Sequence, residues 1–163
     1  MTDPACNETG EQPGDLVGGD FRLIAPLDAG GRHALWRGRQ ESLSRDVVLK
    51  RHTTDPARTR REGARLAAIQ HPGVVQVIAV PTDDRGRPWL VMAWVDGEDL
   101  AAHLARGPIA RTRALRWLRE VADALDHIHG QGLRHLDVKP ANIMVDGSGH
   151  ARLVDFDIAA GAG

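Results

Sequence analysis

A short loop-like stretch of the chain carries three residue types suited to phosphate chemistry. His135–Val145 reads HLDVKPANIMV and contains Asp137, Lys139 and Asn142. A further acidic residue, Asp155, follows within VDFD. Carboxylate and amide oxygens are the ligands that Mg²⁺ prefers, and Mg²⁺ usually takes one or two protein carboxylates together with substrate phosphates. This pattern indicates magnesium-dependent chemistry on a phosphate.

The elements that must position these residues begin with strands. Residues 1–19 are rich in Pro, Gly and acidic residues, so we expect a disordered leader. FRLIAPL, ALWRG and RDVVLK then predict strands separated by turns. DPARTRREGARLAAIQHP predicts a helix with Asp55 as N-cap and Pro56 in its first turn. GVVQVIAV and PWLVMAWV predict two more strands, joined by the hairpin connection DDRGR.

After DGEDL the pattern becomes helical. RTRALRWLREVADALDHIHGQG predicts a long helix whose apolar residues recur at intervals of three and four. The residues of this apolar helix face are Leu115, Leu118, Val121, Ala122, Leu125 and Ile128. Short strands, ANIMVD and ARLVDF, flank the turn GSGH. The element pattern therefore predicts strands followed by helices, with a strand pair near the end.

Composition excludes several classes of protein. The fractions of hydrophobic (42%) and charged (26%) residues are those of an ordinary soluble globular protein. The net charge of -1 gives no field that attracts nucleic acid, and the basic run ARTRREGAR is interpreted as a solvated helix face. The single cysteine cannot form an internal disulfide, and the histidines lack zinc-ligand spacing. Without a signal peptide or a membrane span, we expect a cytoplasmic protein that does not bind nucleic acid.

The order of the motifs resembles the front part of a bacterial Ser/Thr protein kinase domain. VVLK resembles the third-strand lysine motif, RREGARLAAIQHP the helix with the partner glutamate, and LVMAWVDGEDL the hinge. HLDVKPAN resembles the catalytic loop and DFD the metal-binding turn, and the match is colinear from about Phe21. The resemblance implies an α+β fold with an antiparallel N-lobe sheet and one helix over 20–95. The hinge and a partial helical C-lobe would occupy 96–163.

The same resemblance predicts how the chain would end. Because the match stops soon after DFD, we expect a truncated domain without an activation segment or a platform for a peptide substrate. Apolar surface on ALRWLREVADALDHI would then be an exposed patch or would need a partner.

The resemblance also implies a role for each candidate residue, with ATP and Mg²⁺ bound between the lobes. Asp137 would orient the attacking hydroxyl and accept its proton, and Lys139 would steady the transferring phosphoryl group. Asn142 and Asp155 would hold Mg²⁺. The residues implied in ATP binding are Leu27, Gly30, Gly31, Leu35, Val48, Lys50, Glu62, Met92, Ala93 and Val95. Of these, Met92 would sit at the back of the adenine pocket, and residues 93–95 would offer backbone hydrogen bonds to the base.

Lys50 and Glu62 form a predicted pair. Lys50 ends an apolar strand, where its ammonium would project beside the nucleotide, and Glu62 lies on the helix face expected to be buried. A buried carboxylate needs a cationic partner, because burying it unpaired is costly. Lys50 is the natural candidate, and an intrahelical pair with Arg58 or Arg65 is the alternative.

The sequence departs from the family pattern in the phosphate-covering loop. Instead of G-x-G-x-x-G-x-V, the segment DAGGRHAL puts Asp28, Gly30, His33 and Leu35 at the four defining positions. A carboxylate near the phosphates is repulsive, and the loss of two glycines restricts the backbone. We therefore expect weakened nucleotide binding.

Two further departures lie in the later motifs. Leu136 replaces the catalytic-loop arginine that pairs, in relatives, with a phosphate on the activation loop, which argues against that mode of switching. Asp157 replaces a glycine at a cost of about 1 kcal/mol, since aspartate tolerates left-handed backbone better than most residues. Neither change removes the predicted base or a predicted metal ligand.

Three functional hypotheses follow. The first is a Ser/Thr protein kinase-type phosphotransferase acting on a protein, and the second is an inactive pseudokinase or truncated remnant that binds a nucleotide or a regulatory protein partner. The third is a small-molecule phosphotransferase of the aminoglycoside/choline kinase type, because HLD and VDFD also resemble that group. Lys139 and the segment LVMAWVDGEDL favour the first hypothesis over the third.

Overall fold

The computed structural model of the chain describes residues 10–27, 35–51 and 55–156. These residues form two compact units. The first unit contains the described residues up to Ala68 together with Val77–Trp94. The second contains Ile69–Gln76 and the described residues from Val95 onward. The predicted N-lobe, residues 20–95, includes Ile69–Gln76, whereas the structure groups this segment with the second unit.

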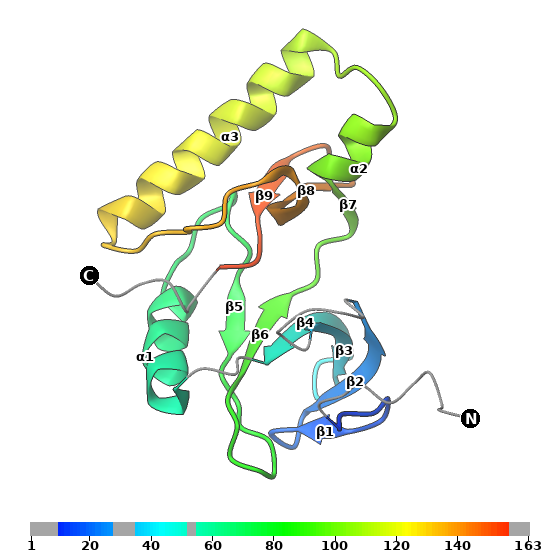
Figure 1. The fold of residues 1–163 in the computed structure, drawn as a ribbon, viewed down its shortest axis with the longest axis vertical. Helices are drawn as coiled ribbons and strands as arrows, with labels where there is room; N and C mark the ends of the chain where they lie inside the picture. Colours follow the sequence, from blue (N-terminus) through cyan, green and yellow to red (C-terminus); the bar gives the residue numbers. More distant parts are fainter. Residues whose placement is uncertain (1–9, 28–34, 52–54, 157–163) are drawn as a thin grey trace. The chain divides into compact units, whose positions relative to one another are not determined.

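An antiparallel sheet with strand order β1-β2-β3-β4-β6-β5 forms the first unit (Figure 1). Its strands are β1 (Leu16–Val17), β2 (Phe21–Pro26), β3 (Leu35–Gln40), β4 (Arg45–Arg51), β5 (Val77–Ala79) and β6 (Trp89–Ala93). Helix α1 (Pro56–Ala67) contacts β5 and β6. As predicted, the Asp55 carboxylate caps this helix by accepting a hydrogen bond from the backbone N–H of Ala57 at 2.9 Å. The predicted strands and helix are confirmed, although only the last part of GVVQVIAV joins this sheet.

Strand pairing sorts the side chains of this sheet onto two faces, because paired residues and alternate residues share a face. One face is a packed apolar core made of Val17, Phe21, Leu23, Trp36, Val47, Leu49, Trp89 and Val91. The opposite face, called here the Lys50 face, carries Leu35, Arg37, Val48, Lys50, Leu90 and Met92, which are neighbours in the ladder. Helix α1 covers part of the Lys50 face, since a Cβ at Gly63 would come within 3.3 Å of the Leu90 side chain.

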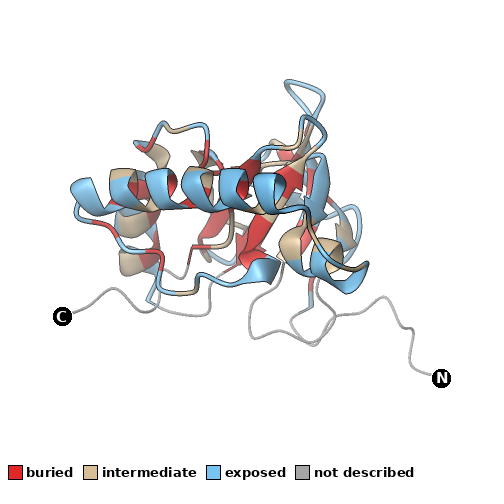
Figure 2. Ribbon diagram, turned by 90° about the horizontal axis from the view of Figure 1, so that it is seen from above, coloured by how far each residue is buried: buried red, intermediate tan, exposed pale blue. Residues whose placement is uncertain are grey.

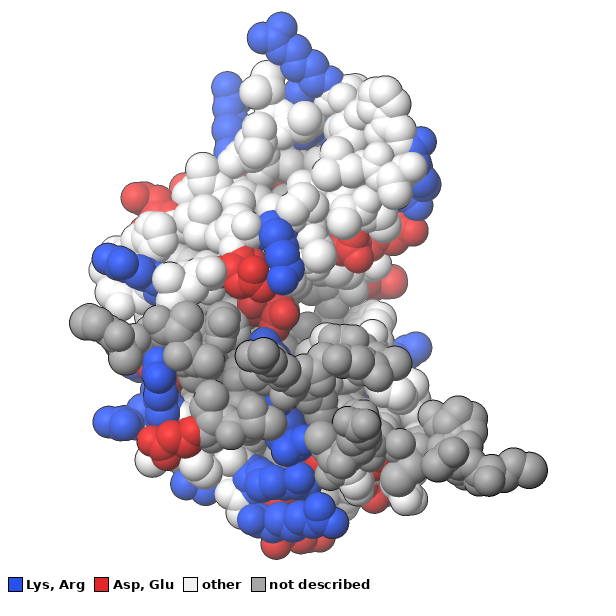
Figure 3. Space-filling model, in the orientation of Figure 1, with Lys and Arg blue, Asp and Glu red and all other residues white. Residues whose placement is uncertain are grey.

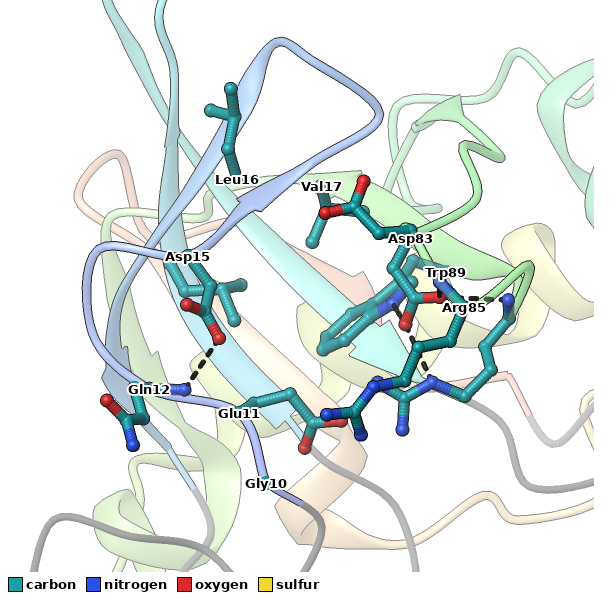
Figure 4. Close-up of a pocket in the computed structure, with 12 residues that line it drawn as sticks. Gly10, Glu11, Gln12, Asp15, Leu16, Val17, Asp83, Arg85 and Trp89 are labelled. Carbon is teal, nitrogen blue, oxygen red and sulfur yellow. Dashed lines mark hydrogen bonds and ion pairs between the residues drawn. The ribbon is translucent and has the colours of Figure 1, made fainter.

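The second half of the predicted disordered leader is folded, which corrects that prediction. Strand β1 pairs with β2, and the Glu11 side chain is only 4% exposed. Glu11 Oε1 lies 3.0 Å from Arg51 Nε and 3.0 Å from Arg87 Nη2. Figure 4 shows this N-terminal segment beside the β5–β6 connection, where the two line a cavity of about 370 Å³. A buried carboxylate with two cationic partners anchors a segment that composition alone marks as disordered. Residues 1–9 lie outside the described residues.

The second unit combines a small sheet with two α-helices and a short 3₁₀ helix. Its elements are β7 (Gly97–Asp99), α2 (Leu100–Ala105), α3 (Arg111–Gly130), η1 (Pro140–Asn142), β8 (Ile143–Asp146) and β9 (Ala151–Leu153). The strand order is β7-β8-β9, and α3 contacts β9. The Ile69–Gln76 segment joins this unit through Leu153, whose N–H donates to Gly73 O at 2.8 Å and whose carbonyl accepts from Val75 N at 2.9 Å. The predicted α+β class is confirmed by the two units together.

Helix α3 buries only part of the apolar face that the sequence indicated, namely Val121 and Ile128. Its buried side chains are Trp117, Val121, Ala124 and Ile128. Leu115 and Leu118 are instead 44% and 63% exposed, and Figure 2 shows the outward side of the helix as exposed. The physical reason is the anchoring of Trp117, whose indole N–H donates to Gly149 O at 2.9 Å and so fixes the rotation of the helix. The two leucines supply the exposed apolar surface that the sequence predicted for this helix.

Charge is mixed over the face of the molecule seen in Figure 3. Arginine and lysine side chains lie next to carboxylates over the first unit, and uncharged side chains cover much of the second unit in this view. Within the ranges that the structure describes, no helix combines the length and the apolar character needed to cross a membrane. The cytoplasmic location and the absence of nucleic-acid binding stay predictions.

Candidate functional site

The loop that carries Asp137 follows the end of α3 and contains a non-glycine residue with a left-handed backbone conformation. The backbone N–H of Leu133 donates to Ile128 O at 3.0 Å, which turns the chain directly after the helix. Leu136 has φ of 64°, in the left-handed region that non-glycine residues rarely adopt. The 3₁₀ helix η1 then begins at Pro140, so the loop doubles back and brings Asn142 to Asp137.

Three of the predicted residues form one hydrogen-bonded cluster. Lys139 Nζ lies 2.7 Å from Asp137 Oδ2. The side-chain amide of Asn142 donates to Asp137 Oδ2 and to its carbonyl oxygen, both at 2.9 Å. The hydrogen bond from Lys139, followed by that from Asn142, outweighs the opposing effect of burial and lowers the pKa of the Asp137 carboxyl. Asp137 is therefore an ionised proton acceptor, and both Lys139 and Asn142 donate hydrogen bonds to it.

His135 links this loop to the strand end that carries Asp155. Its side chain is 1% exposed, with Nε2 donating to Val154 O at 2.8 Å and Nδ1 accepting from Asp137 N at 3.4 Å. The ring lies 4.7 Å from that of Phe156, measured between centroids. Sequence reasoning did not assign a role to His135. Its place directly before Leu136 and Asp137 was the available signal, but burial and both contacts appear only in the structure.

The segments that carry the two predicted metal ligands are joined by a backbone hydrogen bond. The N–H of Val154 donates to Asn142 O at 3.0 Å, which brings the residue before Asp155 to the loop. Asp155 follows with φ of 59°, another left-handed backbone position. Asn142 is 5% exposed, and because its amide nitrogen is used by Asp137, its side-chain oxygen is the atom left to coordinate.

This donor set fits Mg²⁺ that arrives with phosphates. One carboxylate and one amide oxygen are hard ligands, and Mg²⁺ commonly takes its remaining ligands from phosphate and water. Over the described ranges, histidine, cysteine and acidic side chains form no group of three suited to holding a metal ion. Asn142 and Asp155 would therefore contribute two protein ligands to a metal ion whose other ligands come from a substrate.

In the first unit, four of the residues predicted to bind ATP share the Lys50 face. Lys50, which is 5% exposed, lies between Leu35 and Leu90 in the ladder, and Val48 pairs with Met92. The strand register therefore places an ammonium at one end of an apolar surface.

The other residues predicted in ATP binding are placed differently. Ala93 pairs with Val47, so its side chain belongs to the core face and only its backbone is available to a ligand on the Lys50 face. The N–H of Leu27 donates to Leu35 O at 2.8 Å, which sets Leu27 beside β3. Val95 belongs to the second unit. Gly30 and Gly31 lie outside the described residues, as do Asp28, His33 and Asp157.

Glu62 has the intrahelical partner that the sequence left as an alternative. Its Oε1 lies 3.4 Å from Arg58 Nε, one turn earlier on α1. Both side chains are partly exposed, at 24% for Arg58 and 21% for Glu62, so this pair contributes little to stability. The pairing of Glu62 with Lys50 stays a prediction.

Comparisons with known proteins agree with this arrangement. Residues 37–162 match the family model described as the protein kinase domain. The chain is 37% identical over 154 residues to the serine/threonine-protein kinase pkn2 of Myxococcus xanthus, covering 88% of this chain and 18% of that protein. It is 36% identical over 150 residues to the serine/threonine-protein kinase PknB of Mycolicibacterium smegmatis, covering 85% and 24%. The chain thus spans about a fifth to a quarter of the length of these relatives.

A solved structure has the same fold. It is that of Rad53 residues 1–466 in complex with AMP-PNP, with a TM-score of 0.76 at 23% identity, covering 88% of this chain and 40% of that one. The colinear motifs, the Asp137 cluster and the extent of the family match lead to one conclusion: this chain belongs to the protein kinase domain family.

Proposed function

We propose that this chain carries the Mg-ATP-binding and phosphotransfer groups of a Ser/Thr protein kinase. The observation that carries the proposal is that Lys139 and Asn142 both donate a hydrogen bond to the Asp137 carboxylate. An ionised carboxylate held by a lysine and an amide is suited to accept a proton from a hydroxyl group. The named relatives are serine/threonine-protein kinases, so a serine or threonine hydroxyl of a protein is the proposed acceptor.

Each residue of the cluster has one task in the proposed reaction. Asp137 orients the acceptor hydroxyl and takes its proton as the oxygen bonds to the γ-phosphorus of ATP. The bond from that phosphorus to the β–γ bridging oxygen breaks, and ADP leaves with the electron pair. Lys139 places positive charge beside the transferring group, while Asn142 and Asp155 hold Mg²⁺. When bound, Mg²⁺ supplies charge neutralisation on the phosphate oxygens.

The Lys50 face of the first unit supports the nucleotide half of the proposal. An adenine ring needs apolar surface with a few polar groups at its edge. Leu35, Val48 and Met92 offer that surface, and the backbone of Ala93 would offer a polar group at its edge. Lys50, at the end of the same face, would bind phosphate.

Two other hypotheses remain as outcomes of a test. A pseudokinase would keep nucleotide or partner binding without transfer, and a small-molecule phosphotransferase would label an alcohol and not a protein. Lys139 Nζ lies 2.7 Å from Asp137 Oδ2, and the presence of this lysine together with LVMAWVDGEDL favours the protein kinase type. A cytoplasmic location is part of the main proposal, and a regulatory protein partner belongs to the pseudokinase hypothesis.

Incubation with γ-labelled ATP and Mg²⁺ tests the proposal, with casein and a panel of small alcohols as acceptors. Asp137→Ala removes the base, and Asp126→Ala is the matched control, since Asp126 is an exposed aspartate on α3. We expect labelled protein with the wild type and the control, and a loss of about 100- to 10,000-fold with Asp137→Ala.

Other results would replace the proposal. Label on an alcohol alone would support the small-molecule enzyme. No label, but thermal stabilisation by Mg-ATP, would support a nucleotide-binding module. The absence of both would reject Mg-ATP as the ligand.

A further inference from the structure

A charged side chain of the first unit packs on the segment proposed to bind the base. The guanidinium carbon of Arg37 lies 5.0 Å from the ring centroid of Trp94, which follows Ala93 directly. Arg37 Nη2 also lies 2.7 Å from Asp46 Oδ2. The guanidinium therefore has two contacts, one with an indole face and one with a carboxylate.

Strand register brings this cluster to the Lys50 face. Arg37 pairs with Val48, and Val48 pairs with Met92, so Arg37 shares a face with two residues proposed to contact adenine. Asp46 lies two residues before Val48 on β4 and therefore projects to the same side. The cluster of Arg37, Asp46 and Trp94 thus adjoins the apolar surface of that face.

From this geometry we infer that Arg37 is a positioning residue for the base-binding segment, acting through Trp94. This inference rests on the proposed function, because it concerns the binding of ATP. A guanidinium is a planar group that can stack on an aromatic face while its N–H groups bind a carboxylate. Arg37 would hold the indole of Trp94 against β3 and β4. It would thereby fix the backbone next to Ala93 at the distance from Val48 that an adenine ring requires.

Arg39 provides a matched control on the same strand. Its Nη1 lies 3.1 Å from Asp46 Oδ1, and its side chain is as exposed as that of Arg37, at 48% and 45%. The two arginines thus share the strand, the face and the carboxylate partner. Arg37 differs from this control by its contact with the Trp94 ring. A loss of binding due to charge or to the Asp46 pair would appear in both variants, whereas a loss due to the indole contact would appear in one.

The experiment measures the Kd of the full chain for Mg-ATP and for Mg-tripolyphosphate, which has no base. We expect Arg37→Leu to weaken Mg-ATP about 3- to 5-fold, as the loss of one exposed cation–π contact would. Arg39→Leu should stay within about 2-fold, and neither variant should change the affinity for Mg-tripolyphosphate. In a double-mutant cycle, Arg37→Leu should have no further effect on Mg-ATP affinity once Trp94→Leu is present.

The outcomes separate the inference from the function on which it rests. Three results would overturn the role of Arg37 and leave the proposed function standing. They are equal weakening in both arginine variants, an equal loss of affinity for the two ligands, and additive effects with Trp94→Leu. A wild-type chain that does not bind Mg-ATP would overturn the proposed function, and the inference with it.

Discussion

The two units hold their candidate functional side chains by different means. In the second unit, Asp137, Lys139 and Asn142 come from one short loop and contact one another directly. In the first unit, Lys50 and Val48 share a face with residues of other strands because of the ladder register. The loop cluster is a local structure, whereas the Lys50 face exists only if the whole sheet is correctly paired.

Because of this difference, the two candidate sites depend on different supporting contacts. The loop depends on the end of α3, where Ile128 O accepts the hydrogen bond from Leu133. Strand β4 depends on Arg51, the neighbour of Lys50, and on its buried partner Glu11. Removing either support should test whether one unit tolerates damage better than the other.

The largest effect is expected from Ile128→Ala, which removes buried apolar volume near the end of α3. Ile128 is fully buried, so the change should lower the free energy of unfolding by about 4 kcal/mol. Leu118→Ala is the control on the same helix, and because Leu118 is 63% exposed it should change stability by less than about 0.5 kcal/mol. Urea denaturation measures both. Similar losses in the two variants would show that the observed rotation of α3 is wrong.

Glu11→Gln removes the corresponding support of the first unit. The change leaves Arg51 buried without a charged partner and should cost about 3 kcal/mol. Burial lowers the pKa of the Arg51 guanidinium, in line with the small exposure of its side chain. The control is Glu41→Gln on the exposed pair with Arg22, where a much smaller loss is expected because water screens the pair. A loss at Glu11 as small as that at Glu41 would mean that the N-terminal segment is not anchored.

The same contrast explains what could be predicted from the sequence. The loop cluster was predicted because its residues are close in the chain and their types suit one chemistry. The strands and α1 were predicted from alternation, turns and the cap at Asp55. These signals are local, and they were sufficient for most of the strands and helices. The α+β class and the roles of the loop residues were instead implied by the resemblance to protein kinases.

Long-range pairings could not be predicted in this way. The Glu11–Arg51 ion pair joins residues far apart in sequence, so composition indicated disorder where the structure has an anchor. The buried face of α3 depends on the hydrogen bond of Trp117 to Gly149, and helical periodicity alone did not show that Leu115 and Leu118 lie outside this face. Arg37 was not predicted to have a role, since only the register places it beside Trp94.

A smaller effect is expected from relieving backbone strain in the loop. Leu136 has φ of 64° and a half-exposed side chain, so Leu136→Gly removes left-handed strain and loses little packing. Relief of the strain stabilises the folded state, whereas the added freedom of glycine in the unfolded chain opposes this gain. The net change should raise the free energy of unfolding by about 0.5 kcal/mol. Val138→Gly, a similarly exposed position without positive φ, should lower stability by a comparable amount. A decrease in both variants would contradict the strain at Leu136.

The smallest effect concerns the charge that Lys139 supplies to Asp137, because both side chains are about half exposed and water screens their attraction. The folded-state pKa of Asp137 lies below its usual value, so the pair adds stability above the unfolded-state pKa and loses it as the pH falls through the folded-state pKa. Lys139→Met should raise the pKa of Asp137 toward its usual value and move the acid limb of phosphotransfer to higher pH. Lys139→Arg keeps the positive charge and should leave that limb unchanged. An NMR titration of the Asp137 carboxyl carbon measures the shift even without turnover. An unchanged pKa in Lys139→Met would mean that the hydrogen bond from Asn142, and not the ion pair, keeps the proposed base ionised.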